Sequence, residues 1–387
     1  MRISSRVAVL VLVSCLLAGC TKAPPAAPKV EKPSVSPDNA ESVAALTAEG
    51  AKLKKDGNGN VIEVDFRGTM LKKDENGNVV EVDSRDSSAG DNVVSNLSGL
   101  TVVRSLLLND TEISDAALAE IGKITTLTNL DLRGCAVTDA GISSLGGLSN
   151  LKALRFSGKS GKTDVTDDSM PTIAKLTKLK VLALDFLKFA GGAEGLQHLA
   201  GLSEMQELYL GNTLVNDQSL EVIASSFPNL KKLRCAASQV SNVGLEHIAK
   251  MSKLEELDLS ENSQTFDDGL VNLAEMTQLK KLNLWRVQVT DEGVKHLAGL
   301  TNLEWLNLDN ITYLSDEGLP HLAGMRKLTF LHLGSTAITD EGLVHLHPLT
   351  SLKDLKVTRT PVTSDGVAEL KKTLTNTEIQ LKYIAGQ

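Results

Sequence analysis

The chain has 387 residues, of which 42% are apolar and only 3% aromatic, so any large core must be aliphatic. Its formal net charge is −8, and removal of residues 1–19, which contain two arginines and no acid, leaves −8 − 2 = −10. A chain this acidic, without a Lys/Arg-rich run, cannot neutralise nucleic-acid phosphates and repels anionic lipid, so we expect no nucleic-acid partner and a covalent or inserted membrane attachment.

The first residues have the features of an export signal. Arg2 and Arg6 precede an apolar run at 7–17, which is too short for a bilayer span because a span needs about 20 residues. The run ends in Leu-Ala-Gly-Cys at 17–20. This order resembles the lipobox of bacterial lipoproteins, which implies removal of the signal peptide 1–19 and lipidation of Cys20. An ordinary secretory signal cut nearby is the alternative. The resemblance also favours the outer membrane, because Thr21 stands where an Asp would indicate inner-membrane retention.

Residues 20–45 are expected to form a tether between this anchor and the rest of the chain. Five of the ten prolines lie here, mixed with Ala, Lys and Ser. Such a segment buries too little surface to fold, and its prolines favour an extended chain of about 3.1 Å per residue. Twenty residues would then reach ~60 Å from a membrane.

Residues 46–99 contain a short duplication. The segment 53–65 recurs at 71–83, and each copy is a turn-rich patch followed by a β-prone run. The spacing Asp56, Asn58, Asn60 suggests a calcium loop, but Val61 stands where an EF-hand needs Gly and Arg67 where it needs Glu. Asn-Gly turns that lead into strands explain the pattern without a metal.

One unit then repeats to the end of the chain. Its clearest copy places leucines at 303, 306 and 308, followed by a turn and by Ser-Asp-Glu-Gly-Leu at 315–319. The first apolar anchor recurs every 24 to 28 residues at Leu100, Ile124, Leu148, Leu176, Leu202, Phe227, Met251, Met276, Leu300, Met325 and Leu349. Residues 100–373 therefore hold about eleven repeats. A degenerate copy with Val79 and Val82 precedes them, and residues 374–387 form a closing strand near Ile379.

Each repeat predicts one strand and one short helix. The alternation at Leu306 and Leu308 indicates a strand with one buried face, and Leu319 and Leu322 share one face of a helix. A Ser, Thr or Asn before Asp precedes most helices as an N-cap, at Ser114, Thr138, Thr166, Asn216, Thr290, Ser315 and Thr339. Gly recurs two or three positions later, where it costs about 1 kcal/mol relative to Ala, so we expect neighbouring backbones to approach closely there.

Stacked repeats predict a curved α/β solenoid. Strands lie about 4.8 Å apart and helices about 10 Å, so the parallel sheet must line the concave face and the helices the convex face. The pattern resembles the leucine-rich-repeat family over about three quarters of the chain, notably planctomycete proteins. It is also similar to the cysteine-containing repeats of F-box substrate receptors, because Thr, Cys or Asn follows many strands, as at Thr111, Cys135 and Asn262. The resemblance implies protein binding. No F-box precedes the repeats, so no ubiquitin-ligase role is implied.

Candidate chemical sites are weak. Cys135 and Cys235 lie four repeats apart, about 20 Å at strand spacing, which is too far for a disulfide, so we expect two buried, unreactive thiols. Five histidines share one outer helix position about 10 Å apart, too far to share a zinc ion, at His198, His247, His296, His321 and His345. We predict no catalytic residue, cofactor or metal site.

The concave face offers the best ligand contacts. Both tryptophans of the chain fall at outward strand positions, and Phe330 occupies the position of Trp305 one repeat later. The candidate contacts are Trp285, Trp305, Phe330, His332, Asn283 and Asn307. Exposed aromatic anchors are typical of binding hot spots. Aromatic side chains that merely pack along the sheet are the alternative, and Tyr209 lies on the same face three repeats away.

These features predict a non-catalytic scaffold, lipid-anchored at a bacterial cell envelope, that binds an unknown protein through its concave sheet. Carbohydrate or peptidoglycan binding through Trp305 and Phe330, or a purely structural envelope role, are the alternatives.

Overall fold

The computed structural model describes residues 41, 44, 52–55, 61–66, 69–74, 79–83, 90–95, 103–188 and 190–382. Its compact unit covers Pro37–Gln387. The expected signal peptide, Cys20 and nearly all of the expected tether lie outside the described residues. No helix among the described residues is long and apolar enough to cross a membrane.

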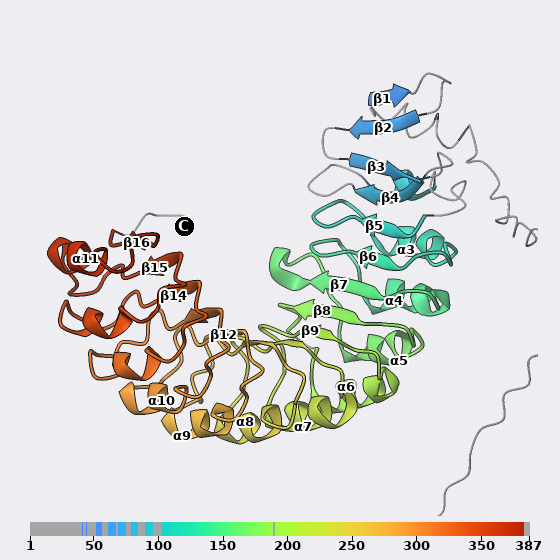
Figure 1. Cartoon of the computed structure of the whole chain (residues 1–387). Helices are drawn as coiled ribbons and strands as arrows, with labels where there is room; N and C mark the ends of the chain where they lie inside the picture. The colour runs from blue at the N-terminus through green and yellow to red at the C-terminus, as the bar shows by residue number, and fades with distance from the viewer. Residues whose placement is uncertain are drawn as a thin grey trace, which may run out of the picture. The chain divides into compact units, whose positions relative to one another are not determined.

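The described strands form one sheet in sequential order from β1 to β16 (Figure 1). Strands β1 to β4 pair antiparallel with one another, and every pair from β4 to β16 is parallel. The strands are β1 Lys52–Lys55, β2 Val61–Phe66, β3 Thr69–Lys73, β4 Val79–Asp83, β5 Ser105–Leu107, β6 Asn129–Asp131, β7 Ala153–Ser157, β8 Val181–Asp185, β9 Glu207–Tyr209, β10 Lys232–Arg234, β11 Glu256–Asp258, β12 Lys281–Asn283, β13 Trp305–Asn307, β14 Phe330–His332, β15 Asp354–Lys356 and β16 Glu378–Gln380.

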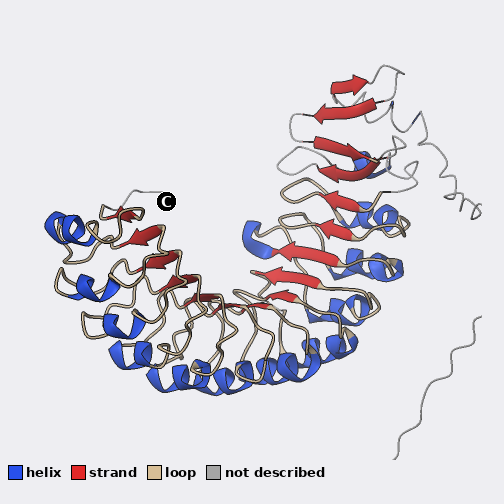
Figure 2. Ribbon diagram, viewed as in Figure 1, coloured by secondary structure: helices blue, strands red, loops and turns tan. Residues whose placement is uncertain are grey.

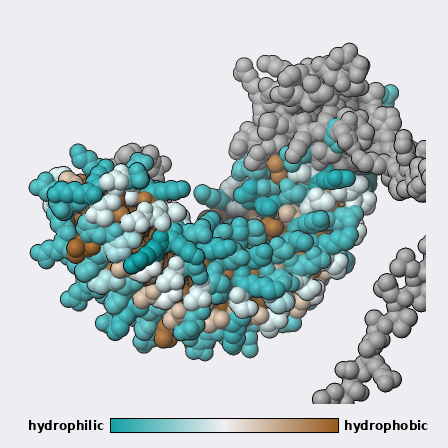
Figure 3. Space-filling view, viewed as in Figure 1, coloured by the Kyte–Doolittle hydropathy of each residue, from teal (hydrophilic) through white to brown (hydrophobic). Residues whose placement is uncertain are grey.

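Short helices return the chain after most strands of the parallel part. Within this unit the strands line the inside of a curve and the helices its outside (Figure 2), and the visible helical surface is mostly hydrophilic (Figure 3). The α-helices are α2 Asp91–Ser95, α3 Asp115–Ile121, α4 Asp139–Ile142, α5 Met170–Ile173, α6 Ala193–His198, α7 Asp217–Ser226, α8 Asn242–Ile248, α9 Asp267–Leu270, α10 Asp291–Lys295 and α11 Ser364–Leu370. The 3₁₀ helices are η2 Ser143–Gly147, η3 Gly158–Ser160, η4 Asp167–Ser169, η5 Leu199–Gly201, η6 Val271–Leu273, η7 Leu319–Leu322 and η8 Gly342–Leu346.

The repeat leucines form one continuous core. Leu303, Leu306 and Leu308 have no exposed surface, and neither have Leu319 and Leu322 from the following helical segment. The segments around 306, 331 and 355 lie side by side as parallel strands. The degenerate first copy is in register as well, because Val82 of β4 lies opposite Leu106 of β5. The predicted solenoid is therefore confirmed.

Aspartates at the helix starts join each repeat to the next. Asp115 accepts hydrogen bonds from the backbone N–H of Thr138 at 2.8 Å and from its hydroxyl at 2.6 Å. Thr138 in turn caps α4 by accepting from Ala140 N–H, as predicted. The same pair of bonds recurs at Asp91–Ser114, Asp139–Thr166, Asp217–Ser241, Asp267–Thr290, Asp291–Ser315, Asp316–Thr339 and Asp340–Thr363. The Ser/Thr-Asp motif thus serves both its own helix and the neighbouring repeat.

The recurring glycines make room for these carboxylates. A Cβ on Gly342 would lie 2.1 Å from Asp316 Oδ1, and one on Gly141 would lie 2.2 Å from Asp115 Oδ1. We expected a neighbouring backbone to approach these glycines closely, and this is wrong. A side-chain carboxylate of the preceding repeat fills the space instead. Period and composition could not reveal this, since the contact joins residues in different repeats.

The polar residues after the strands donate hydrogen bonds to backbone carbonyls just past the strand ends. The Thr111 hydroxyl donates to Leu108 O at 2.6 Å, and the Asn262 amide donates to Leu259 O and Cys235 O. Cys135 and Cys235 are buried free thiols, as predicted. Burial raises the pKa of both thiols, so neither offers the thiolate that nucleophilic chemistry requires.

Candidate functional site

Each inner strand presents two side chains to the concave face, one on either side of its core leucine. The strand register aligns them in two rows. The first row from β9 to β14 is Glu207, Lys232, Glu256, Lys281, Trp305 and Phe330, and the second is Tyr209, Arg234, Asp258, Asn283, Asn307 and His332.

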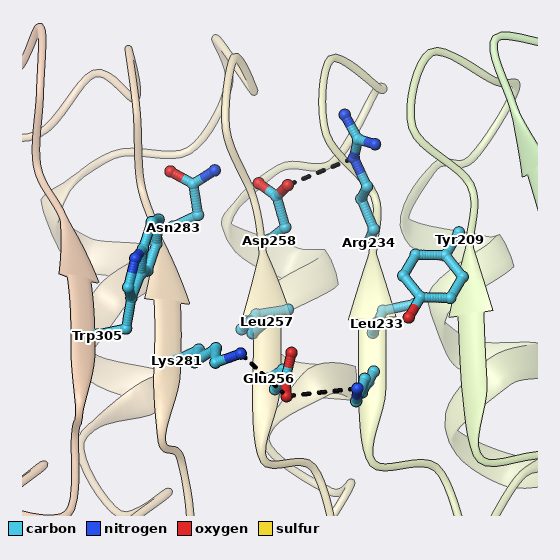
Figure 4. A pocket seen from close by; sticks show the side chains of 10 residues that line it. Tyr209, Leu233, Arg234, Glu256, Leu257, Asp258, Lys281, Asn283 and Trp305 are labelled. Carbon is cyan, nitrogen blue, oxygen red and sulfur yellow. Dashed lines mark ion pairs between the residues drawn. The ribbon is translucent and has the colours of Figure 1, made fainter. Parts of the chain in front are cut away.

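A hollow of about 310 Å³ lies on this face between β9 and β13, and we call it the concave hollow (Figure 4). Tyr209 stands at one end and Trp305 at the other, with Leu233 and Leu257 between them. The remaining lining residues are Lys232, Arg234, Glu256, Asp258, Lys281 and Asn283. The hollow therefore combines two aromatic ends with a strongly charged lining.

The first-row charges neutralise one another. Lys232 Nζ lies 3.5 Å from carboxylate oxygens of both Glu207 and Glu256, and Lys281 Nζ lies 3.5 Å from Glu256. Burial opposes the charge of Lys232, but the two flanking carboxylates outweigh it and raise the pKa of its ammonium group. The charged residues of the first row therefore form a chain of ion pairs and not a patch of like charges.

Arg234 links the second row in the same way. Its guanidinium lies 3.5 Å from Asp185 and 3.4 Å from Asp258. Burial raises the pKa of the Asp185 carboxyl, although the Arg234 charge opposes that shift. The Arg234 Nε atom is buried, and its contact with Asp258 is an ion pair without hydrogen-bond geometry.

Tyr209 is held as a hydrogen-bond donor. Its hydroxyl donates to Glu207 Oε2 at 2.8 Å. Burial and that carboxylate raise the phenol pKa above its usual value, so the ring stays neutral at physiological pH. The Tyr209 ring thus provides a fixed, uncharged end to the concave hollow.

Trp305 and Phe330 stack face to face. Their ring centroids are 4.9 Å apart with planes 5° from parallel, and His332 meets the Phe330 edge at 6.3 Å and 78°. The ammonium of Lys356 lies 5.8 Å from the Phe330 centroid. One face of Trp305 therefore packs along the sheet against Phe330, which is the alternative to ligand contact. Trp305 also lines the concave hollow.

The six predicted contacts do not form one site. Asn283 and Trp305 line the concave hollow, whereas Trp285 and His332 line a second hollow of about 250 Å³ with Asp309, Lys356 and others. Trp285 lies beyond the end of β12, and the Arg286 guanidinium lies 5.3 Å from the centre of its ring. The single cluster expected on repeats 8–10 is thus divided between two hollows.

The two predicted asparagines have a structural task. The Asn283 side-chain oxygen accepts from Trp285 N–H at 3.2 Å, and that of Asn307 accepts from Asp309 N–H at 2.9 Å. Each amide thereby stabilises the turn at its own strand end. The turn uses one acceptor site of each side-chain oxygen.

Sequence reasoning missed most of the lining of the concave hollow. The sequence places Tyr209 on the concave face but three repeats from the predicted contacts, and it does not distinguish Arg234, Glu256 and Asp258 from other residues of the strands. The repeat register was the available signal, because these residues occupy the same two positions as Trp305 and Asn283. The period predicts a curved sheet but does not predict that side chains of five strands enclose one hollow with Tyr209 and Trp305 at its ends.

The described residues contain no group of three or more His, Cys, Asp or Glu placed to hold a metal ion. Of the histidines with this shared repeat position, those at 198, 247, 321 and 345 lie within outer helical segments, and His296 directly follows α10.

Comparison with family models identifies the chain. A model described as a leucine-rich repeat region matches residues 78–364, which is about three quarters of the sequence. The chain belongs to the leucine-rich-repeat family. No curated protein matches it in sequence.

The chain is similar to leucine-rich-repeat proteins among the solved structures, and the internalin likeness supports the fold. An internalin (inlF) from Listeria monocytogenes is 18% identical with a TM-score of 0.55, covering 80% of this chain and 87% of its own. A leucine-rich-repeat protein of Leptospira interrogans is 19% identical with a TM-score of 0.47, covering 74% of this chain and 80% of its own. At these identities the likeness concerns the fold alone.

Proposed function

We propose that this leucine-rich-repeat protein is a non-catalytic scaffold, exported and lipid-anchored at a bacterial cell envelope, that holds a protein partner in its concave hollow. The observation that carries the binding role is the hollow itself, with Tyr209 and Trp305 at its ends and internally paired charges between them. The anchoring role is supported by the signal sequence and Cys20.

The lining indicates which part of a partner would enter. Because the Lys, Arg and acidic groups already pair with one another, the hollow exerts little net attraction on a charged ligand. An apolar or aromatic side chain could instead insert between Tyr209 and Trp305 and exclude water. Polar groups of the partner would meet the hydrogen-bonding rim, which is the usual arrangement around a hot spot.

Carbohydrate binding is a second candidate. The Trp305 face that lines the hollow could stack on a sugar ring. Trp305 and Phe330 cannot hold a sugar between them, because their centroid separation of 4.9 Å is already filled by their own stacking. This candidate therefore rests on one aromatic face, whereas a protein anchor uses both ends of the hollow.

The test uses the full-length protein as bait in detergent extracts of native membranes, together with its Tyr209→Ala and Trp305→Ala variants. Tyr313→Ala is the matched control, since this ring is 69% exposed and lies outside the hollow. We expect a protein that co-purifies with wild type and with Tyr313→Ala but not with the other two. Loss of polysaccharide retention instead would favour the carbohydrate candidate, and no change in either would indicate a structural role.

The anchor is tested separately. Cys20→Ser should abolish incorporation of labelled fatty acid and move the protein to the soluble fraction, whereas Cys135→Ser should change neither. Incorporation that persists in Cys20→Ser would exclude the proposed lipid site without affecting the binding proposal.

A further inference from the structure

Beside β16, part of the core of the described residues is only partly buried. Val367, Ile379 and Leu381 occupy repeat positions that Leu343, Leu355 and Val357 fill one repeat earlier with at most 3% exposure. In the last repeat these three apolar side chains are only partly buried. The core of the described solenoid is therefore open beside β16.

The hydrogen-bonding groups of β16 point in the same direction. Glu378 N–H donates to Lys353 O at 2.8 Å, and Gln380 O accepts from Val357 N–H at 3.0 Å, so both residues face β15. Because backbone groups alternate along a strand, Ile379 and Leu381 present their N–H and C=O groups to the other edge. In the described part of the chain β15 is the only strand paired with β16.

The sequence of this edge is complementary to itself. If a second copy pairs antiparallel about a two-fold axis at Gln380, Ile379 lies opposite the second copy's Leu381, and the two can exchange both backbone hydrogen bonds. Glu378 then lies opposite Lys382 of the second copy, and both are exposed. A shift of two residues in either direction separates these charges, so they select one register.

We propose that β16 pairs with β16 of a second copy, which gives a two-fold dimer with a continuous sheet. The pairing supplies hydrogen-bond partners for the open edge, sets Ile379 beside Leu381 on the core side, and forms two symmetric Glu378–Lys382 ion pairs. The alternative is that Glu378 and Lys382 keep the chain monomeric, because exposed charges on an edge strand prevent association.

Exchange of the charges at positions 378 and 382 distinguishes the dimer from the monomer. In the full chain with Cys15→Ser and Cys20→Ser, sedimentation equilibrium should show a monomer–dimer equilibrium. Glu378→Lys sets two like-charge pairs across the axis and should raise the dissociation constant roughly tenfold. Adding Lys382→Glu should restore it, and thermal melting followed by circular dichroism should show that all variants fold.

A cysteine at the axis gives an independent readout. Directly opposed residues of this pair type have Cα atoms about 4.5 Å apart, within disulfide range, so Gln380→Cys should form a disulfide-linked dimer on mild oxidation. Lys356→Cys, in the same row on β15, is the control, because three strand spacings of about 4.8 Å separate its two copies. A monomer at all concentrations, species larger than dimers, a dimer that ignores the charge exchange, or equal cross-linking at position 356 would each overturn the proposal.

Discussion

At the scale of single residues, an aspartate near the start of the helical segment has several roles in most repeats. Asp316 lies in the turn before η7, accepts two hydrogen bonds from Thr339 at 2.7 and 2.6 Å, and occupies the space that Gly342 leaves open. Carboxylates that accept backbone and hydroxyl bonds are stronger acceptors than neutral groups. The motif therefore couples helix capping to the joining of repeats.

Gly342→Ala should destabilise the protein by about 2 to 3 kcal/mol, because the new methyl group displaces the Asp316 carboxylate from Thr339. Gly147→Ala is the matched control. No atom lies within 4 Å of a Cβ at that position, so its effect should stay within about 0.5 kcal/mol. Urea unfolding measures both, and equal effects would contradict the packing explanation.

His332 links stability to pH. Burial lowers the pKa of its ring below the ordinary 6.5, Lys356 adds to that shift, and Asp309 opposes it. The unfolded chain therefore binds the proton more readily, so the stability contributed by the neutral ring is complete above pH 6.5 and declines as pH falls toward the folded pKa. We expect His332→Gln to reduce the loss of melting temperature between pH 7.5 and 5.5, and an unchanged loss would assign it to other groups.

At the scale of elements, aromatic stacking joins β13 to β14. The parallel rings of Trp305 and Phe330 lie 4.9 Å apart across one strand pair. A double-mutant cycle with Trp305→Ala and Phe330→Ala should give a coupling of about 0.5 to 1.5 kcal/mol in the free energy of unfolding. The same cycle on Tyr209 and Trp305 is the control. Their strands are not adjacent, so additive effects are expected there.

At the scale of the whole molecule, a solenoid tolerates the loss of a complete repeat. Deleting residues 316–339 joins Ser315 to Asp340 and preserves the Ser-Asp-Glu-Gly motif. Because each repeat contacts only its neighbours, this variant should fold and unfold cooperatively, with its concave hollow intact. Deleting residues 328–339 removes the strand but leaves its helical segment, so we expect loss of cooperative thermal unfolding. Cooperative unfolding in both variants would argue against a repeat-by-repeat core.

The leucine period, the capping residues and the alternation at each strand are local properties. They are sufficient to predict the parallel sheet, the outer helices, the buried thiols and the closing strand near Ile379. The candidate site was predicted only in part, since Trp305 and Asn283 do line the concave hollow, whereas Trp285 and His332 line another.

The remaining features depend on contacts between repeats, which a linear pattern does not encode. The tertiary structure placed Tyr209 and Trp305 at the ends of one hollow, filled the glycine positions with the neighbouring aspartates, and left the last core positions open beside β16. The physical reason is that these features depend on how side chains of different repeats pack together, and the repeat period predicts the curved stack but not that packing.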